Sequence, residues 1–416
     1  MSKILRRVAV TGVGLVNPFG GNAEDFFSRI MRGESAVRLY RHPASPIPIA
    51  QPAVACLSFN PEQALGRALS SMTDRYSQLG IAAAFSAWED AGLPRVDCGA
   101  SYYGVSWGTG AGGAQTAEKC YTDFYERGRD RMSPLSVVLA MNNAAASNIA
   151  ISLGLGGACL TYSVACASSA ISIGEAFRRI QIGESSLVVA GGSEAPLTFS
   201  IMRTWEGMRV IAPGDEETAY RACRPFQSGR AGFVLGEGGA ALVLEEWEHA
   251  VARGARIYCE LAGYGQSCDH THLVRPDAKG QVRALNAALR EAELSLADVG
   301  YVNAHGTATP EGDPIEINAL KMTFGDYAAN LAVSSTKSMH GHLLGAAGAM
   351  EALITVLALS RQEIPPTAHL DEVSAECAGV RHVMGKGLRG ESFKAAICNS
   401  FAFGGSNAVL AFRSVS

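Results

Sequence analysis

The sequence predicts an α/β protein whose core is a β-sheet covered by helices. Short β-rich runs recur along the chain, each bounded by glycine, and Ala-rich segments with helical spacing lie between them. The 46 glycines, against only four tryptophans, are typical of layered α/β proteins with tight turns rather than of helical bundles. This alternation of strands and helices favours a mostly parallel sheet.

The expected elements follow one another in a regular order. Strands are predicted over residues 6–16, 101–110, 185–195, 240–248, 258–267, 301–307, 331–336 and 395–405. Helices are predicted over residues 77–93, 279–294 and 348–359. Residues 200–231 are polar and irregular, so an insertion or exposed loop is expected there.

The 416 residues exceed the usual size of one compact domain. The runs at 240–248 and 258–267 look like the end of one unit and the start of a second. We therefore predict an N-terminal half over residues 1–255 and a C-terminal half over residues 256–416. Each half opens with a strand that ends in Gly-x-Gly, in TGVG and AGYG, as structural repeats would.

Composition narrows the class of protein. The formal charge of −4, without a run of Lys or Arg, argues against a nucleic-acid binder. The ten cysteines show no C-x-x-C and no repeated spacing, so we expect reduced thiols in a cytoplasmic protein. No run approaches the length of a membrane span, and the apolar N-terminal stretch is too short and glycine-rich for a signal peptide.

The strongest local feature is TYSVACASSAISIGEAFRRIQIG, which places Cys166 at a turn between a strand and an amphipathic helix. The N–H dipoles of a helix N-terminus stabilise a thiolate by about 0.3–1 kcal/mol, and by up to ~2 kcal/mol when partly buried, which predicts a lowered pKa for Cys166. The adjacent backbone N–H can also face an oxyanion. A cysteine taken alone is more commonly a small buried hydrophobe, so the assignment depends on the other segments.

Three further segments carry candidate chemistry. In YVNAHGTATPEGDPIE, His305 follows an apolar strand, from where it can project into a cleft, although a lone histidine there is more commonly a hydrogen-bonded loop residue. In VSSTKSMHGHLLGAAGAME, Lys337 and His342 precede a small-residue helix that permits close packing. In CNSFAFGGSN, a glycine-rich turn can present backbone donors beside Phe401 and Phe403.

Together these segments resemble the β-ketoacyl-acyl-carrier-protein synthases, the elongating condensing enzymes of fatty acid and polyketide synthesis. The resemblance covers nearly the whole chain and rests on VACASS, HGTATPEGD, STKSMHGHLLGAAG and NSFAFGGSN in that order. A Cys-His-His set is similar to the elongating branch, whereas initiating synthases pair histidine with asparagine and thiolases use a second cysteine. The resemblance implies a duplicated, five-layer α/β/α/β/α thiolase-like fold that dimerises.

The resemblance also implies roles for individual residues. Cys166 would accept an acyl group from a carrier thioester, because a thiol is both a nucleophile and a good leaving group. His305 and His342 would then stabilise the enolate formed when malonyl-acyl carrier protein loses carbon dioxide. The backbone N–H groups of Cys166 and Phe403 would hold the tetrahedral oxyanion, and Lys337 would order the histidine environment.

Further residues follow from the same resemblance. Substrate contacts are expected from Ala111, Thr307, Thr309 and Phe401. No cofactor is required, but a structural monovalent cation is expected near Asn303, Glu351, Asn399 and Ser400. Glu351 would belong to the same buried network as Lys337.

The chain departs from the family pattern in ways that leave its pathway open. Gln227 and Ala231 replace acidic residues around Arg230, which puts the usual salt bridges there in doubt. Ala111 replaces a bulky residue of the acyl tunnel and could admit a longer or stiffer chain. Ala402 replaces glycine and restricts its loop. Polyketide or polyene assembly in secondary metabolism therefore stands as an alternative to fatty acid elongation.

Other function classes can be weighed against this one. A non-catalytic chain-length partner shares the fold but lacks the nucleophile, whereas Cys166 is present. A metalloenzyme could use His270-x-His272 or His340-x-His342, but neither pair has an evident third ligand. A dinucleotide enzyme could use GTGAGG, but no acidic residue on a predicted strand follows at about twenty residues.

The expected partners are an acyl carrier protein and a second synthase subunit, either identical or a chain-length partner. The family usually meets its acidic carrier with a basic patch before the helix at 77–93. Here that segment offers only Arg67 and Arg75, although Arg127, Arg129 and Arg131 could restore the patch in three dimensions. We therefore predict a dedicated, less acidic carrier.

Overall fold

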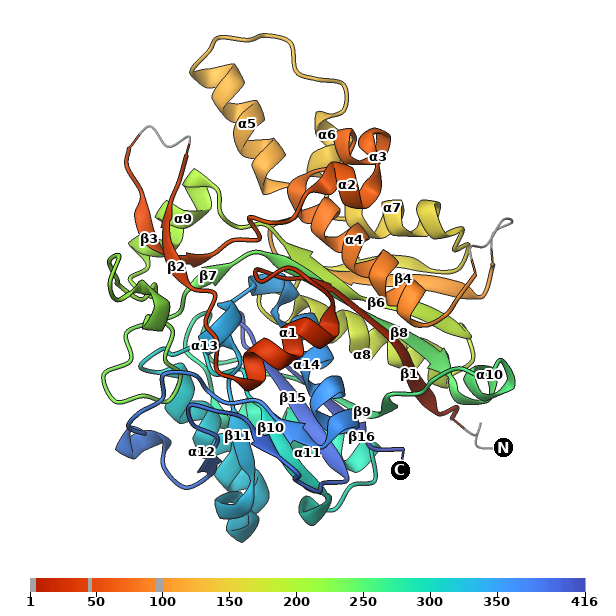
Figure 1. Cartoon of the computed structure of the whole chain (residues 1–416), viewed down its shortest axis with the longest axis vertical. Helices are drawn as coiled ribbons and strands as arrows, with labels where there is room; N and C mark the ends of the chain where they lie inside the picture. The colour runs from red at the N-terminus through yellow and green to blue at the C-terminus, as the bar shows by residue number, and fades with distance from the viewer. Residues whose placement is uncertain (1–4, 44–46, 95–99, 416) are drawn as a thin grey trace.

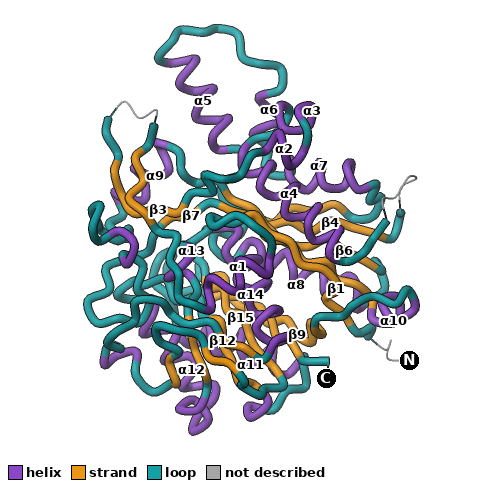
Figure 2. The backbone as a smooth tube through the Cα atoms, viewed as in Figure 1, coloured by secondary structure: helices purple, strands orange, loops and turns teal. Residues whose placement is uncertain are grey.

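A single mixed sheet of 11 strands organises the described part of the chain, residues 5–43, 47–94 and 100–415, in this computed structural model (Figures 1 and 2). The strand order is β13-β11-β10-β15-β16-β9-β1-β8-β6-β4-β5. The strands are β1 (Val8–Val16), β4 (Tyr103–Gly108), β5 (Cys159–Tyr162), β6 (Leu187–Glu194), β8 (Gly238–Glu246), β9 (Cys259–Cys268), β10 (Val299–Asn303), β11 (Ala332–Ser334), β13 (Arg381–His382), β15 (Ala395–Phe401) and β16 (Ser406–Arg413).

The two ends of this sheet repeat one arrangement. Strand β4 lies between β5 and β6 in parallel, and β8 and β1 continue the sheet in antiparallel fashion. Strand β10 lies in the same way between β11 and β15, followed by β16 and β9. The two sets join where Val8–Val10 of β1 pairs with β9. Residue 255 falls in the segment between α10 (Trp247–Ala252) and β9.

Helices divide the molecule into layers. Helices α8 (Ser168–Gln181) and α14 (Ala347–Arg361) contact each other and strands of both sets, so they form a middle layer. Helices α4 (Arg75–Asp90) and α7 (Ala144–Leu153) cover the N-terminal strands, and α11 (Ala278–Glu291) and α12 (Gly312–Phe324) lie in the C-terminal half, where α11 packs on β9 and β16 (Figure 1). The α/β/α/β/α layering expected from the resemblance is present. The segment Leu344–Arg361 is long and apolar enough to cross a membrane, but 89% of it is buried as a core helix.

Smaller elements surround these layers. The minor strands are β2 (Arg38–Arg41), β3 (Ala50–Val54), β7 (Leu235–Gly236), β12 (Glu363–Ile364) and β14 (Leu388–Arg389). The remaining α-helices are α1 (Ala23–Met31), α2 (Pro61–Leu65), α3 (Arg67–Ser71), α5 (Ala114–Tyr125), α6 (Ser136–Ala140), α9 (Phe199–Gly207) and α13 (Lys337–His340). Helix α5 and the loop after it project from the body at the top of Figure 1.

Two expectations from the sequence were wrong. The sheet is not mostly parallel, because antiparallel pairs are as frequent as parallel ones. Strands β15 and β16 are joined by the short turn at 402–405, and a turn of that length permits only antiparallel pairing. The segment 200–231 is not wholly loop, since α9 occupies its start, with the side chain of Thr198 capping the helix.

Candidate active site

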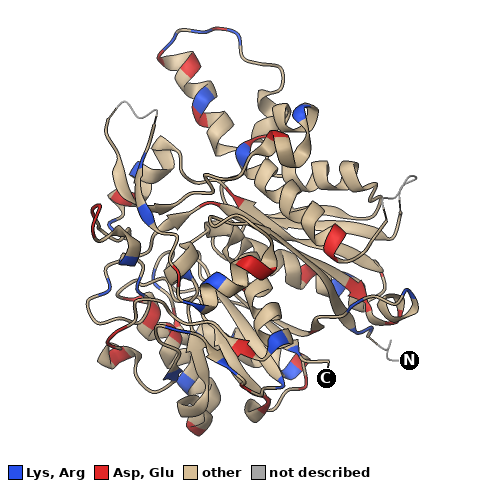
Figure 3. Ribbon diagram, in the orientation of Figure 1, with Lys and Arg blue, Asp and Glu red and all other residues tan. Residues whose placement is uncertain are grey.

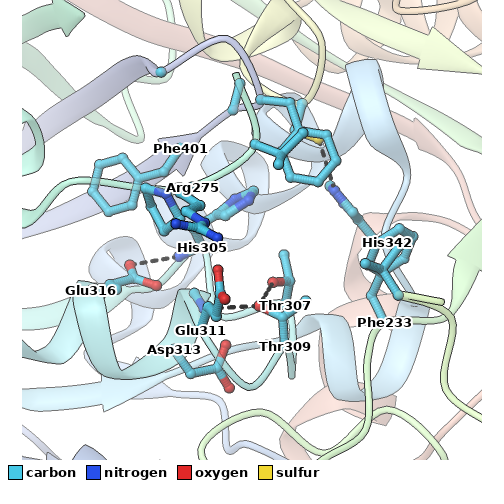
Figure 4. A pocket seen from close by; sticks show the side chains of 18 of the residues that line it. Phe233, Arg275, His305, Thr307, Thr309, Glu311, Asp313, Glu316, His342 and Phe401 are labelled. Carbon is cyan, nitrogen blue, oxygen red and sulfur yellow. Dashed lines mark hydrogen bonds between the residues drawn. The ribbon is translucent and has the colours of Figure 1, made fainter. Parts of the chain in front are cut away.

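A cavity of about 390 Å³ brings Cys166, His305 and His342 together, although they come from segments far apart in the sequence (Figure 4). Cys166 lies between β5 and α8, His305 follows β10, and His342 follows α13. The Nε2 atom of His342 is 3.1 Å from Sγ of Cys166. The ring centroids of the two histidines are 5.5 Å apart.

The turn before α8 presents the Cys166 thiol. Ala165 has a φ of 44°, in the left-handed region that non-glycine residues rarely adopt, and Ala167 is the N-cap of the helix. Such strained turns persist only where the surrounding packing holds them. The strain lets the side chain of Cys166 leave the strand and face the cavity, as the sequence predicts.

The electrostatics of Cys166 differ from the prediction. Burial raises the pKa of this thiol to about 12, and the neighbouring Lys337 only partly opposes the effect. The expectation of a lowered pKa was therefore wrong. A helix N-terminus contributes at most ~2 kcal/mol, which is less than the cost of desolvating a buried thiolate. The resting nucleophile is a neutral thiol, so its proton must leave during the reaction.

Both histidines are neutral for related reasons. Burial and the Lys337 ammonium lower the pKa of His305 well below 6.5, and His342 adds to the effect. Burial and Lys337 likewise lower the pKa of His342. A neutral imidazole carries one N–H donor and one acceptor nitrogen, so each ring can exchange or donate a proton.

Lys337 holds the position of His305. Its Nζ donates to the backbone oxygen of His305 at 2.6 Å and lies 3.5 Å from Nδ1 of the same residue. The ammonium also forms an ion pair with Glu351, and both side chains are fully buried. Burial nevertheless raises the pKa of Glu351 to about 7, against the effect of Lys337.

Glu316 is a second anchor of His305 that the sequence motifs did not indicate. Its carboxylate accepts the backbone N–H of His305 at 2.8 Å and that of Gly306 at 2.7 Å. Asn399 donates to the same carboxylate at 3.0 Å. Glu316 lies on α12, outside the HGTATPEGD motif, and only its place on a buried helix face could have drawn attention to it.

The residues expected at a cation site lie on neighbouring elements. Asn303 donates from Nδ2 to the backbone oxygen of Glu351 at 3.1 Å. Among the described residues, Oδ1 of Asn399 and Oγ of Ser400 are buried without a hydrogen bond, whereas the buried carboxylate of Glu351 has the ion pair with Lys337. Orphaned oxygen atoms are the ligands that a hard cation prefers, so this donor set fits such an ion.

The predicted substrate contacts are only partly brought together. Thr307 and Thr309 line the cavity with their Oγ1 atoms 3.2 Å apart. Phe401 lies edge-to-face against His305 at 6.2 Å, and Phe403 packs on Trp205 at 5.9 Å. Ala111 is not part of the described cavity wall.

The carboxylate of Glu194 holds the backbone of Ala111 in place. This buried carboxylate accepts the backbone N–H groups of Gly110, Ala111 and Gly345 at 2.6, 3.0 and 2.9 Å. It therefore ties the turn after β4 to the start of α14. The sequence did not single it out, although an acidic residue at the end of an otherwise apolar strand is a signal in itself.

Arg230 keeps a full set of partners despite the departures around it. Its guanidinium donates to the backbone oxygens of Thr309 at 2.9 Å and Pro310 at 2.8 Å. It also lies 3.7 Å from the buried carboxylate of Asp313. Gln227 uses its side-chain oxygen to accept the N–H of Asp371 at 2.8 Å, so a neutral acceptor is sufficient there.

The histidine pairs considered as metal ligands do not converge. Nε2 of His340 is 3.0 Å from Oγ1 of Thr336, whereas His342 faces Cys166. His272 accepts the backbone N–H of Val274 at 3.1 Å in an exposed loop, and His270 is exposed.

The sequence is similar to known proteins over nearly its whole length. Residues 5–250 match the family described as "Beta-ketoacyl synthase, N-terminal domain" and residues 258–371 match "Beta-ketoacyl synthase, C-terminal domain". A 3-oxoacyl-[acyl-carrier-protein] synthase 2 of Vibrio harveyi is 39% identical over 420 residues, covering 100% of both chains. Nodulation protein E of Rhizobium sp. (strain N33) is 39% identical over 99% of this chain and 100% of its own.

Solved structures give the same result. The ishigamide ketosynthase/chain length factor superposes with a TM-score of 0.91 at 29% identity, over 99% of this chain and 100% of the other. A Beta-ketoacyl synthase from Burkholderia phymatum STM815 gives 0.89 at 33% identity, with the same coverage. A type II PKS ketosynthase in complex with its acyl-carrier protein, AntDE:AntF, gives 0.89 at 29% identity, over 99% of this chain and 100% of the other.

Proposed function

Because the chain belongs to the β-ketoacyl synthase family and is an acyltransferase, we propose that it condenses an acyl group held on Cys166 with malonyl-acyl carrier protein in fatty acid elongation. The products would be a β-ketoacyl-acyl carrier protein and carbon dioxide. The observation that carries this proposal is the 3.1 Å contact between Nε2 of His342 and Sγ of Cys166 in a cavity shared with His305.

The first half-reaction is acyl transfer. The Cys166 sulfur attacks the thioester carbonyl of the donor, and the S–H proton passes to His342 as the C–S bond forms. The carrier thiol leaves when its C–S bond breaks, and it takes the proton back from His342. A neutral, desolvated histidine suits this shuttle because it holds the proton only briefly.

The second half-reaction is decarboxylation and condensation. The malonyl carboxylate leaves as carbon dioxide, and its bonding electrons form an enolate. The enolate oxygen accepts hydrogen bonds from the N–H of His305 and from His342 in the tautomer that carries its proton on Nε2, which differs from the tautomer that accepts the thiol proton. The enolate carbon attacks the acyl carbonyl on Cys166, and the oxyanion accepts backbone N–H groups from Cys166 and Phe403. Collapse of this intermediate releases the Cys166 thiolate, which takes up a proton from solvent, so that one proton is consumed for each carbon dioxide released. The Lys337 ammonium beside Nδ1 of His305 favours the tautomer with the proton on Nε2.

A monovalent cation would be held by Asn303, Glu351, Asn399 and Ser400. Bound there, it would balance the partial negative charge of these oxygen atoms and take no part in electron or proton transfer. The hydrogen bonds missing at Asn399 and Ser400 support this assignment.

The second candidate is the same condensation in polyketide or polyene synthesis. The high TM-scores with the ishigamide and AntDE:AntF ketosynthases favour it, and so does Ala402 in the loop beside the cavity. Mass spectrometry of the acyl groups trapped on Cys166, after incubation with a panel of acyl carriers, would separate the two pathways. Saturated chains would support elongation, and unsaturated or polyketo chains the alternative. Absence of any acyl group on Cys166 would contradict both.

The carrier protein and a second synthase subunit are the proposed partners, in the cytoplasm. Strand β5 lies at the edge of the 11-stranded sheet and exposes Leu160, while Ile151 on α7 is 78% exposed. An edge strand beside exposed apolar residues suits pairing with another subunit. Native mass spectrometry of the chain alone would show a dimer if the partner is a second copy, and a monomer if it is a different chain-length subunit.

A further inference from the structure

Arg275 occupies an unusual place in the cavity wall. It lies in the loop between β9 and α11, it is exposed, and it lines the same cavity as Cys166 and His305 (Figure 4). Other arginines near the cavity are engaged, as Arg230 is by Thr309 and Pro310. Within the described residues, the guanidinium of Arg275 has no hydrogen bond or ion pair that would neutralise it, and only its backbone N–H is bound, by His272 at 3.3 Å.

The acidic groups that share this wall do not compete for Arg275. Asp269 accepts the side chain of Asn407 at 2.6 Å and the N–H of Asp277 at 2.9 Å. Asp313 and Glu316 accept backbone N–H groups in the same way. Glu311 is exposed beside the cavity but forms no ion pair with Arg275. The remaining wall is largely apolar, with Trp205, Met208 and Phe233 among its members.

The loop that carries Arg275 is held in place. Its Leu273 oxygen accepts the N–H of Gly404 at 2.7 Å, and the N–H of Asp269 donates to Gly405 at 2.8 Å. The backbone of this loop is therefore fixed to the turn that contains Phe403, and the Arg275 side chain extends from that fixed backbone. A group bound by Arg275 would be positioned relative to the reaction centre rather than merely attracted to the surface.

We propose that Arg275 binds the phosphate of the phosphopantetheine arm that carries the acyl and malonyl groups, and so selects phosphorylated thioesters over dephosphorylated ones. The inference rests on the proposed acyl transfer to Cys166. A planar guanidinium without a partner among the described residues, at the exposed part of a cavity whose own carboxylates are mostly engaged, matches the bidentate geometry of a phosphate. A phosphate belongs at that exposed position, because the arm must present its thioester to the buried Cys166 while its charged end stays in solvent.

The test compares two donors that differ only in the phosphate, acyl-pantetheine and acyl-4′-phosphopantetheine with the same acyl chain. The rate of Cys166 acylation is measured for each by mass spectrometry. We expect the phosphate to raise the rate roughly three- to tenfold, as one partly exposed charge-assisted contact would. Arg275→Ala should bring this ratio close to one, and Arg275→Lys should keep part of it. Lys279→Ala, which removes an exposed charge at the start of α11, should leave the ratio unchanged.

The possible outcomes separate the two proposals. A ratio close to one in the parent enzyme, or an unchanged ratio in Arg275→Ala, overturns the role of Arg275 while the acyl transfer stands. No acylation by either donor would instead contradict the proposed function. Calorimetry with unacylated phosphopantetheine and pantetheine repeats the comparison without chemistry. Repeating the acylation with acyl-carrier protein as donor distinguishes the carrier-borne phosphate from that of a free thioester. If Arg275→Ala does not slow the acylation of Cys166 by acyl-carrier protein, the proposed contact with the carrier-borne phosphate is overturned.

Discussion

The starts of α8 and α14 occupy equivalent positions in the two repeated halves, yet they serve different purposes. Ala165, with φ of 44°, lies three residues before the first residue of α8, and Leu344, with φ of 45°, lies three residues before the first residue of α14. The next residue is Cys166 in one half and Gly345 in the other. Two turns of the same backbone conformation thus differ in use. The turn in the N-terminal half presents a thiol, and the turn in the C-terminal half packs closely against its neighbours.

The difference lies in the space around each turn. A Cβ atom added to Gly345 would lie 2.2 Å from the backbone nitrogen of Gly110 and 2.5 Å from Glu194. The side chain of Cys166 faces a cavity instead. The C-terminal turn contributes its chemistry through His342, which lies just before it and reaches across to Cys166. The two halves share this backbone turn, but only the turn before α8 has space for a side chain that faces the cavity.

The largest expected effect comes from removing the thiol. Cys166→Ala should lower condensation by at least about 10³-fold, because no other group on this turn can hold the acyl chain. Steady-state condensation and mass spectrometry of the acylated protein measure the loss. Cys159→Ala, at an exposed cysteine of β5, is the matched control and should keep the acyl group. Acylation that persists in Cys166→Ala would break the assignment of the N-terminal turn.

The histidines test the division of labour between the halves. His305→Ala and His342→Ala should each lower malonyl decarboxylation by about 10²–10³-fold, the usual cost of losing one donor to an oxyanion. Both variants should still acylate Cys166 to some extent, but His342→Ala should do so more slowly than His305→Ala, because His342 accepts the S–H proton. Decarboxylation is followed by release of carbon dioxide from malonyl carrier. A parent rate in His342→Ala would show that the C-terminal turn contributes structure only.

Gly345→Ala tests the tight turn directly. The added methyl would press on the backbone of Gly110, so we expect a loss of about 1–3 kcal/mol in the free energy of unfolding. Denaturant titration measures it. Gly207→Ala is the control, because no atom lies within 4 Å of the added Cβ there, and it should cost nothing. Equal stability of the two variants would mean that the turn before α14 can relax.

The sequence indicated the reactive residues better than their electrostatics. The motifs predicted Cys166, His305 and His342, and the structure places all three in one cavity although they lie far apart in the chain. The pKa of Cys166 could not be predicted in the same way, since burial depends on all the elements around it. Glu194 was missed because its partners are backbone N–H groups from distant segments, so that its ending of an apolar strand was the only local signal. Glu316 closes the segment that contains His305, but the sequence does not show that its carboxylate turns back to the backbone of His305 and Gly306.

In the fold, likewise, some features can be predicted from the sequence and others cannot. The limits of α4, α11 and α14 follow from helical periodicity, and Asp74 and Asp277 cap the first two as polar residues before apolar runs do. The directions of β8 and β16 could not be read from the sequence, because a strand looks alike whichever way it pairs. The duplicated layering came from the resemblance, and the repeated strand order in the structure explains why each half has its own turn.

The pH dependence of alkylation tests the electrostatics of the N-terminal turn. Since burial raises the pKa of Cys166 to about 12, the thiolate fraction should rise about tenfold per pH unit between about pH 7 and about pH 9. Iodoacetamide labelling of Cys166, followed by peptide mass spectrometry, should rise with it and reach no plateau. A plateau near neutral pH would show that the helix terminus outweighs desolvation and that the thiolate is preformed.

The smallest expected effect concerns the carrier surface, which lies apart from both turns. Arg75 is paired with Glu237 at 2.8 Å, and Asp123 pairs with Arg127 at 2.7 Å and Arg129 at 3.2 Å. Basic and acidic residues are interspersed along the ribbon in Figure 3. The single carboxylate of Asp123 is shared by Arg127 and Arg129, so it offsets only part of the positive charge that could restore a basic patch.

Arg67 and Arg131 remain exposed, and no ion pair of either is found in the part of the chain that the structure describes. An exposed charge pair contributes about 0–1 kcal/mol and is screened by salt. With a standard acidic fatty-acid carrier, KM should be high and should change less than about threefold between low and high salt. Arg67→Glu and Arg131→Glu should each raise KM by less than about fivefold, since a single exposed pair is involved. Steady-state kinetics at two salt concentrations measure both effects. Tight, strongly salt-sensitive use of that carrier would favour housekeeping elongation, because only a clustered basic surface steers an acidic partner in that way.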